Sequence, residues 1–531
     1  MFFIFTLKFT KKLSCVIMHA KTLSATTIGV DAHLVEVEVD ISLGLVNFFI
    51  VGLPDAAIKE SSKRVYTALK NCGYRLPAKK ITVNLAPADL KKEGALFDLP
   101  ITIGILLAAE QLNLSRPFLE ETLFLGELSL DGSIRFIKGA LAIAYDAQRL
   151  GKRRIIVPQA NAEEAALIEG IEVIGVNHIT ELIEHLRGER TIAPTASHFQ
   201  TFLEKAQTTD LDYAQVKGQT QAKRALQIAA AGRHNIVFIG PPGSGKTMLA
   251  KRLPSIMPPM TFDECLETSK IYSISGKLTS TPLVASRPFR DPHHTISQAG
   301  LVGGGSYPQP GEISLAHHGV LFLDELAEFK RTTLEILRQP LESKEVAISR
   351  VHHAVRFPAA FLLIAALNPC PCGFWGDAKR TCTCSSRQIE RYIEKLSGPL
   401  LDRIDLHVNV QAVAYDAATA HSDERYSSPV MRAAIQQAVA TQRSRFGNTH
   451  TWNAHMTSDM IEQYCPLEPT AEQALKKAFD VLNLSMRGYH KILKIARTIA
   501  DLEGSLLIKL SHIQEALTYR SLDKQLERQR S

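Results

Sequence analysis

The sequence predicts an α/β protein with three folded parts: a mixed α+β domain, an α/β domain built on a parallel sheet, and a small helical domain. In residues 18–187, alternating or apolar runs typical of strands are interspersed with helical patterns. In residues 213–415, short and almost wholly apolar runs alternate with helices, as parallel strands buried on both faces require. Residues 431–525 keep helical spacing and carry few strand signals, which predicts a helical bundle.

The individual elements follow from these patterns. In the first domain, strands are expected at residues 35–41, 46–51, 81–85 and 155–157, and helices at Ala56–Asn71 and 95–110. Residues 188–212 are polar and contain Pro194, which predicts a linker. In the second domain, a helical entry at residues 216–232 is followed by strands at 236–239, 320–323 and 361–366.

Composition restricts the partners and the compartment. The net charge of +7 is compatible with a nucleic-acid partner, but it is spread over 531 residues and is therefore a weak indicator. No stretch supplies the ~20 consecutive apolar residues of a membrane span, so no membrane partner is expected. The chain has eight cysteines, and four of them lie within residues 370–384. Such clustering suits a metal or reduced thiols better than a secreted disulfide framework, which predicts a cytoplasmic location.

The first residues do not fit a secretory signal. Residues 1–13 are apolar first and basic afterwards, whereas a secretory signal carries its positive charge before the apolar run. We interpret residues 1–17 as a leader or as the product of a start assigned too early, with Met18 as the true start.

A phosphate-binding loop follows the strand at residues 236–239. The pattern G-x-x-x-x-G-K-[ST] lies between a predicted strand and a predicted helix, and this context supports its interpretation as a phosphate-binding loop. Glycines let backbone N–H groups close around phosphates, and the helix that follows directs its positive end at them. We expect Lys246 to contact the β and γ phosphates of ATP, and the Thr247 hydroxyl to coordinate Mg²⁺. The expected ATP-binding residues are Gly240, Pro241, Pro242, Gly243, Ser244, Gly245, Lys246 and Thr247.

Two carboxylates end a second apolar strand, at residues 320–323. Ligands of open α/β sheets bind at the carboxyl ends of the strands, so these groups should face the same site. We expect Asp324 to hold Mg²⁺, directly or through water, and Glu325 to polarise the attacking water. Asn368 follows the strand at 361–366, where its amide either positions the same water or caps the next turn.

Arg403 precedes another apolar run. Its charge suits a finger that crosses a subunit interface to a neighbour's γ-phosphate, which would imply a ring. The alternative is a local ion pair with Asp402 or Asp405.

Four thiols directly follow Asn368 in two C-x-C pairs. Two close pairs of thiolates can complete a tetrahedral zinc site that would stiffen the loop beside the ATP site. The alternative is four reduced cysteines without a metal, because C-x-C spacing is less usual than C-x-x-C. The candidate ligands are Cys370, Cys372, Cys382 and Cys384.

These motifs, in this order, resemble the AAA+ class. Residues 310–325 resemble its magnesium-chelatase and MCM-helicase branch, in which residues 288–310 would be an insert in the second helix. Residues 346–357 resemble the presensor hairpin of that branch, with its tip at 350–353. The resemblance also implies a second nucleotide sensor, for which the candidates are Arg487, which we favour, and Arg497.

From about Met18 to the end, the chain resembles the ComM/YifB family of magnesium-chelatase-like ATPases. The matching segments include residues 52–55, 84–90 and 97–100. The resemblance implies a hexamer formed with ATP that drives branch migration of DNA during DNA uptake. It also implies that the first domain has the Lon/S5-like α+β fold, which Lon proteases share with a ribosomal protein.

The first domain lacks the catalytic pair of Lon proteases, a serine and a lysine. Leu96 and Phe97 stand where the serine should be, and Leu141 falls near the lysine position, with Lys138 displaced from it. We therefore interpret this domain as a non-proteolytic scaffold, which argues against a proteolytic machine.

With a proteolytic function disfavoured, two functions remain. One is a DNA motor, and the other is a chelatase-type motor subunit that drives metal insertion by a partner enzyme. The first is favoured because the N-terminal domain resembles ComM/YifB proteins. Basic residues that could follow DNA phosphates are, on the hairpin, Arg350, His352 and His353, with Lys344 and Arg356 near them, and, on the insert, Arg287, Arg290, His293 and His294. The alternative for these charges is a solvated loop.

Overall fold

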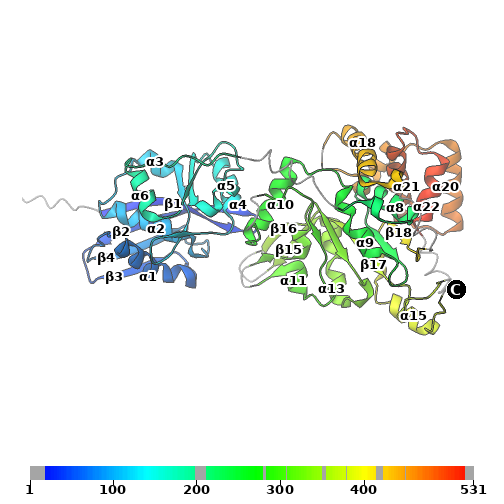
Figure 1. Cartoon of the computed structure of the whole chain (residues 1–531), viewed down its shortest axis with the longest axis horizontal. Helices are drawn as coiled ribbons and strands as arrows, with labels where there is room; N and C mark the ends of the chain where they lie inside the picture. Colours follow the sequence, from blue (N-terminus) through cyan, green and yellow to red (C-terminus); the bar gives the residue numbers. More distant parts are fainter. Residues whose placement is uncertain are drawn as a thin grey trace, which may run out of the picture. The chain divides into compact units, whose positions relative to one another are not determined.

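The computed structural model describes residues 18–197, 211–278, 283–305, 308–349, 354–377, 380–413, 423–448 and 450–520. The chain divides into two compact units, one formed by residues 1–199 with 273–282, the other by residues 200–272 with 283–531 (Figure 1). The expected leader, residues 1–17, and the hairpin tip, residues 350–353, lie outside the described residues. Among the residues described, no helix is both long and apolar enough to cross a membrane.

The first unit is built on a mixed sheet. Among the described residues its strands run in the order β3-β4-β2-β1-β5-β8-β9. The pairs β1–β2 and β2–β4 are antiparallel, whereas β3–β4, β1–β5, β5–β8 and β8–β9 are parallel. The strands are β1 (Met18–Ile28), β2 (Asp31–Ser42), β3 (Asn47–Val51), β4 (Lys80–Ala86), β5 (Thr122–Phe124), β8 (Arg154–Pro158) and β9 (Glu172–Val176), with a small hairpin of β6 (Glu127–Leu128) and β7 (Ile134–Arg135).

Helices cover this sheet because their apolar stripes pack against alternate strand residues such as Val35, Val37 and Val39, which are fully buried. The helices are α1 (Ala56–Asn71), α2 (Asp98–Ala108), α3 (Arg116–Glu121), α4 (Ala140–Arg149), α5 (Gln159–Ala165) and α6 (Ile179–Leu186). The helix expected at residues 95–110 is instead a 3₁₀ turn, Ala95–Phe97, followed by α2. The two join at Asp98, whose buried carboxylate accepts hydrogen bonds from the Arg64 side chain at 2.7 Å and from the Leu128 amide at 3.1 Å.

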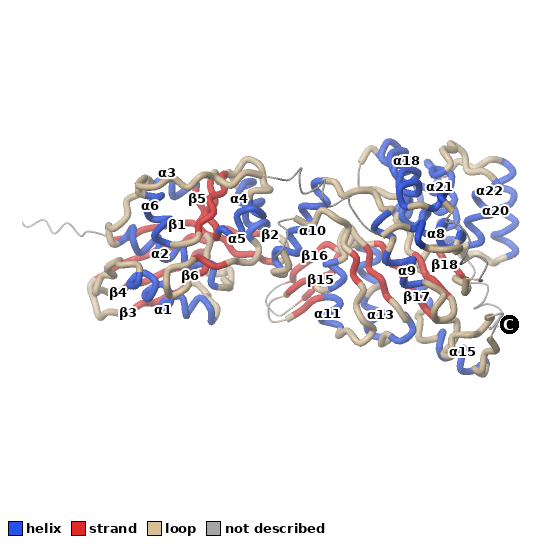
Figure 2. The backbone as a smooth tube through the Cα atoms, viewed as in Figure 1, coloured by secondary structure: helices blue, strands red, loops and turns tan. Residues whose placement is uncertain are grey.

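The second unit contains the parallel sheet that the sequence predicts. In the described part of the chain the strand order is β11-β14-β17-β10-β18, and every neighbouring pair is parallel. Figure 2 shows strands of this unit in red, among them β17 and β18, with helices beside them. The strands are β11 (Phe289–Arg290), β14 (Val320–Leu323), β17 (Leu362–Leu367), β10 (Ile236–Ile239) and β18 (Leu406–Asn409). The α/β fold class with a parallel sheet is therefore confirmed.

The helices of this unit connect the strands and then form the C-terminal lid. Those around the sheet are α8 (Thr220–Gly232), α9 (Lys246–Lys251), α10 (Phe262–Ile274), α11 (Gln298–Val302), α12 (Glu312–Leu315), α13 (Arg331–Ile336), α14 (Arg338–Ser343), α15 (Ser386–Ile393) and α16 (Gly398–Leu401). The lid consists of α18 (Ser428–Phe446), α19 (Ser458–Tyr464), α20 (Pro469–Val481), α21 (Met486–Leu502) and α22 (Leu510–Thr518).

One hydrophobic core extends from the sheet into the lid. Buried side chains of β10 and α8 belong to the same cluster as those of α18 and α21, among them Phe238, Leu226, Ile435 and Ile492. This continuity explains why sheet and lid form one compact unit. The expected division into domains 213–415 and 431–525 stays a prediction.

Candidate nucleotide site

The phosphate loop, residues 240–247, joins β10 to α9 at the carboxyl edge of the parallel sheet. Gly240 must be glycine, because a Cβ there would lie 2.0 Å from the carbonyl oxygen of Val410. Gly243 and Gly245 have φ values of 77° and 91°, which L side chains rarely adopt. The glycines therefore permit a tight loop whose backbone N–H groups can surround an anion.

Lys246 is 8% exposed and lies across this loop. Its Nζ donates hydrogen bonds to the carbonyls of Gly240 at 2.7 Å and Pro241 at 2.9 Å, and to Asn368 Oδ1 at 3.2 Å. Burial lowers the pKa of Lys246, while the charges of Asp324 and Glu325 oppose that shift. Asn368 reaches the site because β17, which it follows, pairs with β10.

The two residues expected to hold Mg²⁺ are in contact. Thr247 Oγ1 donates a hydrogen bond of 2.6 Å to Asp324 Oδ2, although the two residues are 77 positions apart. A hydroxyl and a carboxylate oxygen are the hard ligands that Mg²⁺ prefers. The residues at this position therefore fit a magnesium ion held together with the phosphates of a nucleotide.

Glu325 has a different environment from its neighbour Asp324. Its φ is 52°, in the left-handed region, and its side chain is 55% exposed. Glu325 Oε2 lies 3.4 Å from Nδ1 of His294, whose ring is tilted by 33° against that of His293, with centroids 4.1 Å apart. His294, a candidate for DNA contact from its sequence position, thus lies beside the expected catalytic carboxylate, and its contact with DNA stays a prediction. The adjacency of β11 and β14 places His294 there, and no sequence motif signals it.

Three family models match the chain in succession. "Subunit ChlI of Mg-chelatase" matches residues 37–161, "Magnesium chelatase, subunit ChlI" residues 212–418, and "Magnesium chelatase, subunit ChlI C-terminal" residues 425–520. The "Competence protein ComM" of Haemophilus influenzae is 44% identical over 508 residues, which are 95% of this chain and 98% of that protein. YifB of Salmonella typhimurium is 42% identical over 516 residues, 97% of this chain and 98% of the relative.

The chain belongs to the ComM/YifB family. It is thus an AAA+ ATPase with magnesium-chelatase-like domains, as the sequence motifs indicated. A more distant relative, the magnesium-chelatase 38 kDa subunit of Cereibacter sphaeroides, is 24% identical over 175 residues, which are 30% of this chain and 52% of that protein.

In this ComM/YifB protein, Arg403 lies beside a glutamate that sequence reasoning did not select. Its side chain is 15% exposed, and its guanidinium pairs with Glu342 of α14, not with Asp402 or Asp405. The backbone carbonyl of Arg403 accepts a hydrogen bond of 2.9 Å from the Asn235 side chain. Action of Arg403 on a neighbouring subunit stays a prediction, and it requires exchange of Glu342 for a phosphate.

The two candidates for the second sensor differ in their environment. Arg497 is 2% exposed and bonds to Asp501 Oδ1 at 3.0 Å and to the carbonyl of Leu506 at 2.7 Å. Arg497 is therefore bonded inside the lid in this structure, which favours the other candidate. Arg487 is exposed in the first turn of α21 and remains the candidate.

Two basic residues of the insert, Arg287 and Arg290, form hydrogen bonds and ion pairs within the chain. Arg287 is 6% exposed and bonds to Glu264 at 3.0 Å and to the carbonyl of His318 at 2.7 Å, so its expected DNA contact is wrong. Arg290 bonds to Glu312 at 2.8 Å. Residues 350–353, which include Arg350, His352 and His353, lie outside the described residues.

Gln219 is a site residue that sequence reasoning missed. Its side-chain Nε2 donates to the carbonyls of Ser244 at 3.2 Å and Gln411 at 2.7 Å. It thereby connects the phosphate loop to the segment after β18. The only available signal was the pair Gly218-Gln219 before α8, which is too short to carry a prediction by itself.

The Lon-like position of the first unit is filled by apolar side chains. Phe97 and Leu141 are fully buried in the unit's interior, and Leu96 is half-buried. None of these groups is a nucleophile or a base, which supports the non-proteolytic interpretation.

Proposed function

We propose that this protein is an ATP-driven motor on DNA, which acts as a hexameric ring in the cytoplasm and catalyses strand displacement or branch migration during DNA uptake and recombination. The observation that carries the proposal is the position of the hairpin formed by β15 (Glu345–Ser349) and β16 (Ala354–Pro358). This hairpin lies in the chain between the acidic strand β14 and β17, the strand that ends beside Asn368. Changes at the ATP site can therefore reach the hairpin through its own flanking strands.

The geometry of the site supports the chemistry that we propose for it. Bound Mg²⁺ would neutralise charge on the phosphates that react. Thr247 and Asp324 would hold that ion, and Lys246 would bind the phosphates across the glycine loop. Glu325 would accept the proton of the attacking water at a carboxylate oxygen, and the Asn368 amide would orient the water.

The role in DNA uptake is supported by the relative named "Competence protein ComM", which aligns along 95% of this chain. The hairpin also offers charge: Arg356 is 76% exposed and lies 3.5 Å from Glu345. We expect the tip residues Arg350, His352 and His353 to contact backbone phosphates in the pore of the ring.

A chelatase-type motor subunit is the second candidate, since the family models and the Cereibacter relative carry the magnesium-chelatase name. The two proposals share the nucleotide site and differ in the partner that stimulates it. The ComM relative covers far more of the chain than the chelatase relative, which favours the DNA motor.

DNA-stimulated ATPase activity separates these candidates. We expect single-stranded or forked DNA to accelerate ATP hydrolysis by the wild-type protein and Arg350→Ala to reduce the stimulation. The variant should also flatten the salt dependence of DNA binding by up to about one unit of log–log slope. Arg116→Ala, which removes an exposed arginine of the first unit, is the control. An absence of stimulation by any DNA would favour the chelatase-type alternative, and an unchanged salt slope in Arg350→Ala would exclude the tip contact.

A further inference from the structure

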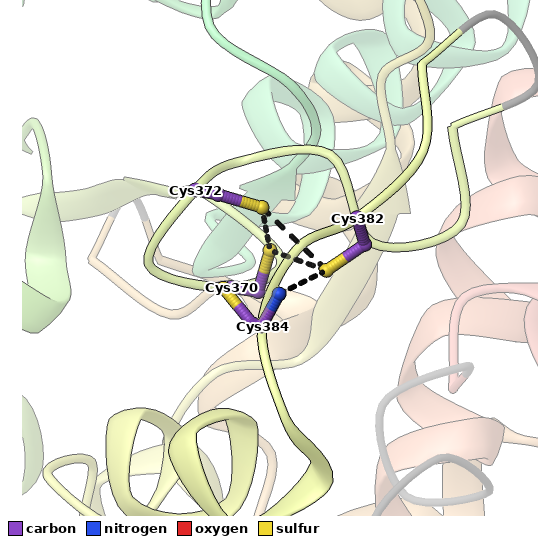
Figure 3. A group of neighbouring side chains, drawn as sticks. All are labelled: Cys370, Cys372, Cys382 and Cys384. Atoms are coloured by element: carbon purple, nitrogen blue, oxygen red, sulfur yellow. Dashed lines mark hydrogen bonds between the residues drawn. The ribbon is translucent and has the colours of Figure 1, made fainter.

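Four cysteine side chains gather in the second unit, in the loop between β17 and α15 (Figure 3). The Sγ atoms of Cys370 and Cys372 are 3.3 Å apart, and Cys382 Sγ lies 3.6 Å from the first and 3.5 Å from the second. All four sulfurs, including that of Cys384, lie within 4.8 Å of one another. The four therefore form a compact cluster although they come from two separate C-x-C pairs.

These separations suit a metal better than a disulfide. A zinc ion with Zn–S bonds of ~2.3 Å holds its four tetrahedral sulfurs about 3.8 Å apart. A disulfide needs sulfurs at about 2.05 Å. The observed distances of 3.3 to 3.6 Å are close to the edges of the tetrahedron and far from a covalent bond.

Backbone amides add a second feature of such sites. The Trp375 amide donates to Cys370 Sγ at 3.3 Å, and the Cys384 amide donates to Cys382 Sγ at 3.4 Å. Hydrogen bonds of this kind stabilise the thiolate form, which is the form that binds metals. Cys370 is fully buried and the other three cysteines are half-buried, so four protein ligands would enclose the ion.

A metal cross-link would stabilise the shape of this loop. Between Asn368 and Ser385, the described residues contain neither helix nor strand. A segment of this length and irregularity has few backbone contacts of its own, whereas metal binding supplies folding free energy directly.

The loop also packs on the nucleotide site. A Cβ at Gly373, between the two cysteine pairs, would lie 2.6 Å from Cδ of Pro242 in the phosphate loop. Asn368, which bonds to Lys246, stands two residues before the first cysteine. On the other side, Cys384 is followed at once by α15, whose N-cap Ser385 forms a capping box with Gln388.

We propose that Cys370, Cys372, Cys382 and Cys384 bind one structural zinc ion, and that this ion fixes the loop that supports the phosphate loop through Gly373 and Pro242. Metal binding itself is independent of the enzyme's activity. The effect on the phosphate loop rests on the proposed ATP site.

The first experiment measures metal content without any assay of activity. Untagged protein is purified without chelators and analysed for zinc, and cobalt substitution is followed by absorption. We expect about one zinc per chain and the absorption of a tetrahedral cobalt–thiolate site. Cys372→Ser combined with Cys384→Ser should lose the metal, and Cys72→Ser, which changes a cysteine of the first unit, should keep it.

Cys384→His tests the coordination without removing a ligand, since three cysteines and a histidine also bind zinc, and it should retain the metal. The site would be refuted if the wild-type protein contained no metal, showed no cobalt–thiolate absorption, and had all four thiols alkylated as fast in the native state as in the denatured state.

The second experiment measures nucleotide affinity with a fluorescent ATP analogue. The double serine variant, and Gly373→Ala with its zinc retained, should each bind about tenfold more weakly than the wild type, which corresponds to ~1.4 kcal/mol. If a metal-free variant bound the ATP analogue as tightly as the wild type, the proposed effect of the zinc on the phosphate loop would be wrong. The proposal that the four cysteines bind zinc would still stand. Failure of the wild type to bind the analogue would instead contradict the proposed ATP site.

Discussion

The adjacent carboxylates Asp324 and Glu325 have different surroundings although they share one strand end. Asp324 accepts hydrogen bonds from the Thr247 hydroxyl and from the Glu325 amide, so both of its oxygens are held. Glu325 turns away through a left-handed backbone and stays half-exposed beside His294. The first arrangement suits a metal ligand and the second suits a base that must reach water.

Glu325→Gln should bind ATP as the wild type does and hydrolyse it about 10²- to 10⁴-fold more slowly, because the amide keeps the shape of the carboxylate and cannot accept the proton. Lys246→Ala should instead weaken ATP binding, because the ammonium group acts on the phosphates. Binding is measured by titration and turnover by phosphate release. Hydrolysis by Glu325→Gln at the wild-type rate would refute the assignment.

His294→Ala should raise basal ATP hydrolysis about two- to fivefold and leave the KM for ATP unchanged. The contact with His294 occupies one carboxylate oxygen of Glu325, Oε2, and an exposed pair of this kind contributes about 0.4–1 kcal/mol. His33→Ala, which removes an exposed histidine of β2 in the first unit, is the control. The measurement is the turnover number and the KM of each variant in steady-state kinetics. A lower turnover number in His294→Ala would contradict the prediction and mean that His294 assists the carboxylate.

At the scale of the element, α5 of the first unit carries a buried acid. Glu164 is 4% exposed, and its Oε1 accepts a hydrogen bond of 2.6 Å from Asn161, which also bonds to both backbone groups of Ile137. Burial raises the pKa of Glu164 to about 7, while the bond from Asn161 opposes that rise. The helix therefore holds a carboxyl group that prefers to be neutral in the folded state.

The stability of the first unit should consequently fall as pH rises. A folded-state pKa above the unfolded value gives stability that is complete below about pH 4.5 and is lost as pH rises through about 7. Glu164→Gln should remove this loss, which is on the order of 3 kcal/mol. Thermal unfolding at pH 5 and pH 8 is the measurement. The variant's advantage should appear at pH 8 only; an equal difference at both values would contradict the role of ionisation.

At the scale of the whole molecule, the lid and the Arg403 segment are connected within the second unit. Lys491 of α21 donates to the carbonyls of Asp402 and Ile404, and lies 3.7 Å from the Asp405 carboxylate. From the other side, Asn235 bonds to the carbonyl of Arg403 and to the amide of Leu363 in β17. Arg403 is thus attached to both the lid and the strand that ends at Asn368.

If Arg403 acts on the nucleotide of a neighbouring subunit, mixtures of variants will reveal it. Arg403→Ala should assemble and bind ATP but hydrolyse it poorly, and Lys246→Ala should also be nearly inactive. Mixing the two should restore part of the ATPase activity, because some interfaces then combine an intact arginine with an intact phosphate loop. No recovery at any ratio would show that Arg403 acts only within its own chain.

Many helices, strands and contiguous motifs of this protein can be predicted from the local sequence. The bounds of α1, β10 and β14 coincide with the predicted ranges, because side-chain periodicity and short apolar runs report burial directly. The phosphate loop and the acidic strand end are likewise contiguous motifs. The order of strands then brings Lys246 and Asn368 together, since carboxyl ends of parallel strands meet at one edge.

Other features were decided only by tertiary structure. The contact of His294 with Glu325, the pairing of Arg403 with Glu342, and the burial of Arg497 each depend on how distant segments or side chains pack. The sequence identifies the charge of such a residue but not its partner. The strength of an ion pair depends on the distance between the two charges in the folded structure, which the sequence does not give directly. The cysteine pairs show the same division: their spacing left zinc and free thiols open, and the folded loop brings four sulfurs within 4.8 Å of one another.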